Sequence, residues 1–314
     1  MNLVELPAEQ KRRLDEVAVV LRSCRDVYME VWKEGLNTPR PGSQAAFDFA
    51  LVEECPAGVW PSELTAIPRN LATKLLRQQA DHCVAVAVLI ENTEIFDPLL
   101  SVVRAGFEYT TRAMWVLDPT ASPRERCVRA ALTELISKTM ARQAASDLPD
   151  SPDLQQARAV AKTQWREQVR RLEELFHDVN RDDGDPLKWT IEGVGYASWT
   201  EAAETWSKIE NTGVSGRAIY NQLAVLAHPQ GYSATVGLRP DPADASGTIR
   251  LVDLIRVEKA ARITVQSFYS ALTMLTSYHG LRSKIVSRWE SEIQAVFPTF
   301  FNADGDAADL EENT

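Results

Sequence analysis

The stretch PRNLATKLLRQQADHCVAVAVLIENTEIFDPLLSVVRAGFEYTTRAMWVLDP, residues 68–119, is the densest apolar segment of the chain. Its apolar residues recur at helical spacing on both sides of a polar break at Asn92. Pro68 and Pro98 each suit the first turn of a helix, where the missing N–H group costs nothing. The stretch therefore predicts two long helices folded back on each other, the second ending just before Pro119.

The same periodicity predicts further helices before and after this hairpin. They are expected at residues 7–34, 122–146, 151–180, 198–210, 217–228, 251–281 and 283–296. A small β-hairpin is compatible with the turn-rich segment near 232–252. The expected fold class is all-α, a multi-helix bundle with that small hairpin.

The domain organisation follows from the segments that lack helical periodicity. Residues 36–62 are rich in Pro, Gly and Ser, and we expect a long loop with up to one helical turn, whose aromatic side chains, Phe47 and Phe49 among them, pack on the core. The alternative is a mobile lid. The sequence thus predicts an N-terminal helix and aromatic loop (1–62) packed on a helical bundle domain (63–298). The acidic segment 299–314 is expected to be a disordered tail.

Composition limits the classes of function. The chain has 314 residues, 45% of them hydrophobic, which is enough for a large core. Its net charge of −10 argues against an extended nucleic-acid surface, but not against a small basic site. No charge-free apolar run is long enough to span a bilayer, and the first residues lack the apolar region of a signal peptide. With four cysteines far apart in sequence, we expect reduced thiols and a cytoplasmic protein without membrane contact.

Three charged residues, Arg104, Glu108 and Arg112, interrupt the apolar run of the second hairpin helix. Arg104 and Glu108 are four residues apart and share a helix face with Trp115. A buried charge without a partner is costly, so two interpretations stay open. Either the two side chains form a structural ion pair that fixes helix packing, or Arg104 binds an anion and Glu108 orients it.

His228 is the histidine with the clearest candidate role. It ends a predicted helix, where a protonated imidazole interacts favourably with the helix dipole. In the alternative interpretation it lines a polar pocket with Tyr220 and Asn221, which lie about two turns earlier near the same face. A histidine in such a pocket can act as an acid or base near neutral pH. The candidate catalytic residues are thus His228, Arg104 and Glu108, and the candidate binding residues are Tyr220, Asn221 and Trp115.

The sequence predicts no metal ion and no cofactor. Glu174 and His177 have the spacing of half a di-iron carboxylate site, but the second Glu-x-x-His motif that such a bundle site needs is absent. No two cysteines lie within four residues of each other, so there is no zinc-binding pattern.

Two segments together, SVVRAGFEYTTRAMWVLDP (101–119) and YNQLAVLAHPQGYS (220–233), carry a resemblance. They resemble a broad set of uncharacterised bacterial all-helical proteins that are similar to the HEPN superfamily of helical bundles. The resemblance covers about residues 64–281. It implies a helical bundle that dimerises. It also implies RNase activity, which many members have in toxin–antitoxin or antiphage systems.

The catalytic pattern of the HEPN nucleases is an arginine, then four to six residues, then a histidine. Here Arg217 precedes His228 by eleven positions, and the position nearest to that of the family's arginine holds Asn221 or Gln222. If the activity is present, the resemblance implies that the arginine comes from elsewhere, with Arg104 as the candidate.

Two functions of different classes follow. The first is a helical binding or interaction module, a sensor or partner component of a bacterial defence or regulatory system, acting as a homo-oligomer or with a protein partner. The second is a metal-independent endoribonuclease in which His228 acts as acid and base while Arg104 stabilises the charge on phosphorus. The acidic net charge and the long Arg217-to-His228 spacing favour the first.

Overall fold

The computed structural model describes residues 6–36, 38–53, 63–92, 98–148, 151–181, 185–227, 238–241, 244–250 and 254–301. Within these residues the chain forms ten α-helices, one short 3-10 helix and five short strands, so the predicted all-α fold is confirmed. The helices are α1 (Ala8–Lys33), α2 (Gln44–Glu53), α3 (Glu63–Glu91), α4 (Leu99–Val116), α5 (Pro123–Ser146), α6 (Pro152–Leu175), α7 (Trp199–Glu210), α8 (Gly216–Ala227), α10 (Leu254–Tyr278) and α11 (Lys284–Val296).

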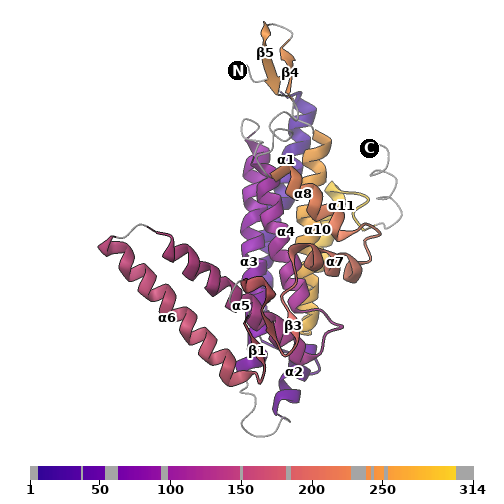
Figure 1. The fold of residues 1–314 in the computed structure, drawn as a ribbon. Coiled ribbons are helices and arrows are strands. Elements are labelled where there is room, and N and C mark those ends of the chain that lie inside the picture. Colours follow the sequence, from indigo (N-terminus) through magenta and orange to yellow (C-terminus); the bar gives the residue numbers. More distant parts are fainter. Residues whose placement is uncertain are drawn as a thin grey trace.

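Four long helices, α1, α3, α4 and α10, lie side by side and form the body of the bundle (Figure 1). Their facing sides bury one continuous apolar core, because each helix places apolar residues three and four positions apart. The helix α11 covers α1, and the helices α7 and α8 cover α4. In the part of the chain that the structure describes, no helix is both long enough and apolar enough to cross a membrane.

The central hairpin is present as α3 and α4, but α3 does not begin where the sequence suggested. It starts at Glu63, and Pro68 lies inside it rather than in its first turn. Proline has no N–H group for the carbonyl four residues earlier, which here is that of Leu64. That carbonyl instead accepts a hydrogen bond from the thiol of Cys127 on α5, at 3.5 Å. A neighbouring helix thus helps to accommodate a proline that in isolation would end α3.

The expected loop at 36–62 contains a helix, and the prediction for its two phenylalanines is wrong. Ser43 accepts a hydrogen bond from the N–H of Ala46 at 3.1 Å and starts α2. Phe47 is 56% exposed and Phe49 is 40% exposed, so neither is buried in the core. A polar residue anchors α2 instead. Asp48, on the inner side of this helix, is almost fully buried.

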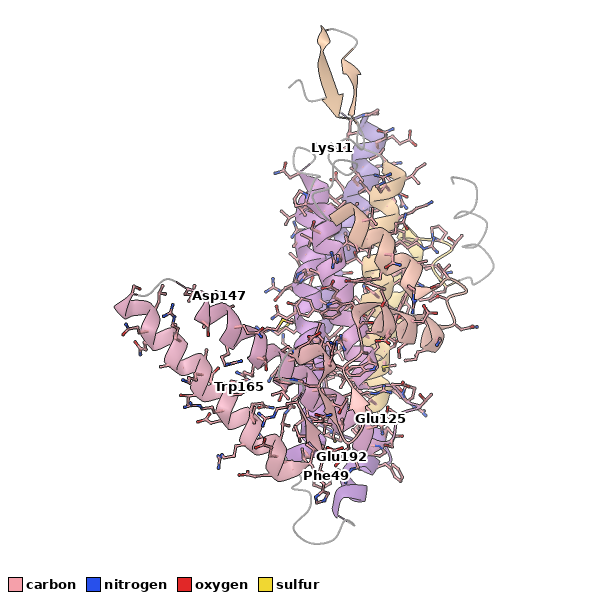
Figure 2. All side chains as sticks on the ribbon, in the orientation of Figure 1. Lys11, Phe49, Glu125, Asp147, Trp165 and Glu192 are labelled. Atoms are coloured by element: carbon pink, nitrogen blue, oxygen red, sulfur yellow. The ribbon has the colours of Figure 1, made fainter. Side chains whose placement is uncertain are left out.

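The helices α5 and α6 form an antiparallel hairpin that projects away from the bundle (Figure 1), and we refer to residues 133–171 as the arm. Figure 2 shows Asp147 and Trp165 on this arm, and Glu192 and Phe49 near its base. A second, smaller apolar core lies at the base, around Leu132, Leu172 and Phe176. Further out, no residue of α6 before Val169 is buried among those whose side chains are described.

Two small sheets complete the fold. The strands β1 (Val179–Asn180), β2 (Thr190–Ile191) and β3 (Val194–Gly195) form an antiparallel sheet under the arm, with the short 3-10 helix Pro186–Lys188 between the first two. The helix expected at 151–180 is therefore wrong at its end: α6 stops at Leu175, the backbone becomes extended at Phe176, and Val179–Asn180 is a strand. The strands β4 (Leu238–Asp241) and β5 (Asp244–Arg250) pair antiparallel and confirm the hairpin expected near 232–252. The tail from residue 302 onward lies outside the described residues.

Candidate functional site

Three of the candidate residues meet between α4 and α8. The spacing of four residues places Arg104 and Glu108 on one face of α4, where the Arg104 Nε donates to Glu108 Oε1 at 3.0 Å. Tyr220 reaches the pair from α8. Its hydroxyl accepts from Arg104 Nη2 at 2.9 Å and donates to Glu108 Oε1 at 3.1 Å. The three side chains close a triangle of hydrogen bonds that joins the two helices.

The electrostatics of this triangle suit a stable ion pair. The side chains of Arg104 and Glu108 are each 21% exposed, so the pair is only partly screened by water. Partial burial opposes the charge of Arg104, but hydrogen bonds and attraction from Tyr220 and Glu108 outweigh it and raise the pKa of Arg104. Burial, with the nearby negative charge of Glu108, raises the pKa of Tyr220. Tyr220 is therefore a neutral hydroxyl at physiological pH, and it acts as a hydrogen-bonding bridge.

The other candidate residues are not part of this triangle. Asn221 is exposed on α8, and Trp115 is buried. The ring of Trp115 contacts the guanidinium groups of Arg112 and Arg129, 4.8 and 5.2 Å from its centroid. His228 lies outside the described residues, so its role as acid, base or helix cap stays a prediction.

Arg112, the third charge of the apolar run, is fully buried and forms a second polar cluster, whose other members the sequence did not connect to it. Its guanidinium carbon lies 3.9 Å from the ring centroid of Tyr196 and 4.6 Å from that of Trp199. Its Nη2 donates to the carbonyl of Ala197 at 2.8 Å, which ties the segment before α7 to α4. Burial lowers the pKa of Arg112 to about 10, so the group stays charged at neutral pH and is held by aromatic faces. The signal in the sequence was an arginine in an apolar helix and an aromatic-rich loop 84 residues later.

A buried ion pair fixes α2 to the rest of the molecule. Asp48 accepts hydrogen bonds from Arg126 on α5, at 2.6 and 3.0 Å, and from the hydroxyl of Tyr278 on α10 at 2.8 Å. The side chains of Arg126 and Asp48 are 2% and 4% exposed. This network is structural, because all three side chains point inward and each has a hydrogen-bond partner within the network.

A row of basic side chains follows α6 on the arm. Arg158, Lys162, Arg166 and Arg170 are each four residues apart, so they form one stripe with about 6 Å of helix between neighbours. Between residues 154 and 172 the only acidic residue is Glu167. The exposed side chains of Lys162 and Arg166 make no ion pair or hydrogen bond with any described residue. Arg158 is directed back to α5, where its Nε donates to the carbonyl of Ala145 at 3.2 Å.

The described residues hold no group of three or more His, Cys, Asp or Glu side chains that could bind a metal ion. The comparisons add no relative: no family model matches the sequence, and neither a curated protein nor a solved structure matches it. The geometry of the chain itself is therefore the basis for assigning a function.

Proposed function

We propose that the protein is a helical interaction module whose arm binds an acidic segment of a partner protein. The observation that carries the proposal is the basic stripe on the projecting α6, with Lys162 and Arg166 exposed and unpaired within the described residues. The whole chain has a net charge of −10, so a local basic stripe is the exception to its general charge. Such a stripe attracts and orients an acidic surface.

The shape of the arm supports the same proposal. The outer halves of the two helices bury little apolar surface, whereas most of the stability of a helix in a protein comes from such packing. The arm also exposes apolar side chains, with Met140 and Val160 each 48% exposed. A bound partner would cover this surface and stabilise the outer half of the arm.

The observations favour a protein partner over a nucleic acid. A chain with ten excess negative charges repels a polyanion at long range, and four basic residues on one helix are a small footprint. The endoribonuclease alternative needs Arg104 to face a substrate, whereas Arg104 is engaged with Glu108 and Tyr220. We therefore keep the interaction module as the proposed function, in a defence or regulatory system as the sequence suggested.

The test is affinity purification of the full chain from its source cells after nuclease treatment, which removes contacts bridged by nucleic acid. Three versions are compared: the wild type, Lys162→Glu/Arg166→Glu on the arm, and Lys74→Glu/Arg77→Glu on α3. Lys74 and Arg77 are also exposed on a helix, so the control reverses the same charges on the bundle. The proposal predicts a protein retained by the wild type and the control and lost from the arm variant. Equal retention by all three, or no retained protein, contradicts it.

A further inference from the structure

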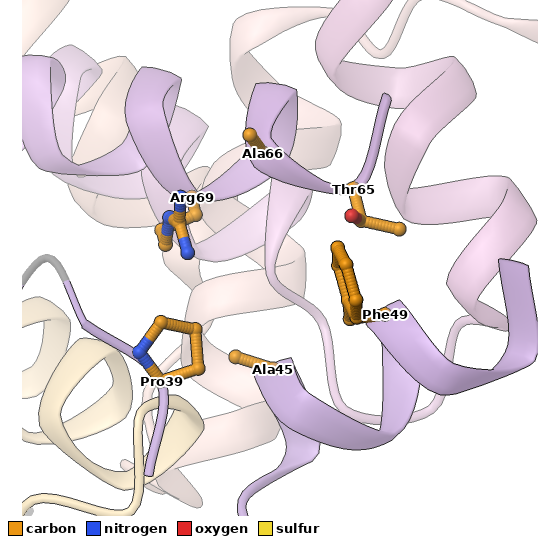
Figure 3. Close-up of a pocket in the computed structure, with 6 residues that line it drawn as sticks. All are labelled: Pro39, Ala45, Phe49, Thr65, Ala66 and Arg69. Carbon is orange, nitrogen blue, oxygen red and sulfur yellow. The ribbon is translucent and has the colours of Figure 1, made fainter. Parts of the chain in front are cut away.

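A small cavity lies where α2 packs against the first turns of α3 (Figure 3). Its volume is about 80 Å³, and it is lined by Pro39, Ala45, Phe49, Thr65, Ala66 and Arg69. Arg69 and Pro39 line one side, while Thr65 and the ring of Phe49 line the other (Figure 3). A space of this size holds a few water molecules or one ligand of a few heavy atoms. No residue of the arm lines it, and the inference drawn from it is independent of the proposed function.

The positive charge of Arg69 at this cavity has no counter-charge among the described residues. Its Nε is buried and has no hydrogen-bond partner, and its guanidinium forms no ion pair with any described residue. A buried N–H group without an acceptor is costly, and more so on a charged group. Ordered water would supply an acceptor, but it would not supply the negative charge.

A buried histidine, His279, lies near Arg69. The carbonyl of His279 accepts from the N–H of Arg40, next to Pro39, at 3.1 Å, and Gly280 packs against Ser43. The imidazole is fully buried, and neither Nδ1 nor Nε2 has a partner within the described residues. Burial, and then the nearby charge of Arg69, lower the pKa of His279 to about 4. The ring is therefore neutral at pH 7 and carries one hydrogen-bond donor and one hydrogen-bond acceptor.

We propose that the cavity binds a small oxyanion, with Arg69 supplying the positive charge. The size limits the ligand to inorganic phosphate or a small carboxylate, or to such a group at the end of a larger molecule. The buried Nε–H of Arg69 lacks an acceptor, and a guanidinium favours an oxygen anion as its partner.

The experiment measures the melting temperature of the full chain with added phosphate or acetate, against sodium chloride at the same ionic strength. A ligand that binds only the folded state raises the melting temperature by mass action. At a concentration well above the dissociation constant, we expect a rise of about 2–4 °C or more. The anion that produces the rise identifies the ligand class. The variants are Arg69→Gln and, as a matched control, Arg77→Gln, an exposed arginine two turns along α3.

The proposal predicts that the wild type and Arg77→Gln respond to the anion and that Arg69→Gln does not. A second readout is the NMR signal of the His279 ring, which can be assigned because the chain has four histidines. The bound anion should shift this signal in the wild type at concentrations that leave His177 unchanged. No rise with either anion, an equal rise in Arg69→Gln, or an unchanged His279 signal overturns the proposal and leaves water as the occupant.

Discussion

The hydroxyl of Tyr220 on α8 lies 2.9 Å from Nη2 of Arg104 on α4, and this hydrogen bond connects residues 116 positions apart. The guanidinium carbon of Arg104 also lies 5.3 Å from the centre of the Tyr220 ring. Because the hydroxyl donates to Glu108 at the same time, it bridges an ion pair that α4 forms within itself. The relationship places the three candidate residues in one structural contact between the helices.

Replacing Tyr220 with Phe tests the strength of this contact. The variant keeps the ring and the Arg104–Glu108 pair but removes both hydrogen bonds to α8. Since hydrogen bonds to charged groups are worth more than neutral ones, we expect a loss of about 1–2 kcal/mol in the free energy of unfolding, measured in urea. Tyr109→Phe is the control, because the hydroxyl of Tyr109 has no partner among the described residues. Equal effects of the two variants would show that the bridge contributes nothing.

The buried pair of Asp48 and Arg126 should be far more sensitive. Asp48→Asn leaves the guanidinium of Arg126 without its counter-charge in the interior, which costs about 3–5 kcal/mol. The comparison is Glu174→Gln, which breaks the exposed pair of Arg170 and Glu174 on α6 and should cost under about 0.5 kcal/mol. Denaturant unfolding of both variants measures the difference. A small effect of Asp48→Asn would mean that α2 is not held by this network.

The buried His279 predicts a pH dependence of stability with a definite sign. Its pKa is about 4 in the folded protein against 6.5 for the ordinary group, so the unfolded chain takes up the proton first. Stability is therefore complete above pH 6.5 and falls as the pH is lowered toward 4, by about 3 kcal/mol in total. Between pH 6.5 and 5 this slope should disappear in His279→Gln and persist in His177→Gln, an exposed residue. An unchanged slope in His279→Gln would show that another group causes the pH dependence.

The close approach of α3 and α4 depends on Gly106. A methyl group there would lie 2.2 Å from the side-chain oxygen of Gln79, which is fully buried. We expect Gly106→Ala to lose about 1–3 kcal/mol of stability by overpacking. In the double variant with Gln79→Ala the losses should not add, because the second change removes the clash. If the two losses of stability add strictly, the cost of Gly106→Ala does not come from the contact with Gln79.

The sequence predicted the elements whose signals are local. The apolar periodicity of 68–119 predicted the α3–α4 hairpin. The helix expected at 198–210 is α7, which starts with a capping box of Ser198 and Glu201. The spacing of Arg104 and Glu108 placed both on one face of α4, where they form an ion pair.

What the sequence could not predict depends on contacts between distant residues. Pro68 is accommodated inside α3, where Cys127 binds the carbonyl that the proline leaves free. Arg126 pairs with Asp48 across 78 positions, and no pattern in either segment indicates the other. The strands β1 to β3 are two residues each, too short for an alternating pattern to be read.

The most direct test of the interaction module is site-specific photo-crosslinking in the source cells. A photoreactive amino acid replaces Ala159, an exposed residue beside Lys162 and Arg166 on α6, or Ala295, an equally small exposed residue on α11. We predict a discrete covalent adduct with a protein at position 159, lost in the Lys162→Glu/Arg166→Glu background, and none at position 295. An adduct at 295 alone, the same adducts at both positions, or an adduct at 159 that survives the charge reversal would contradict a partner bound along the basic stripe.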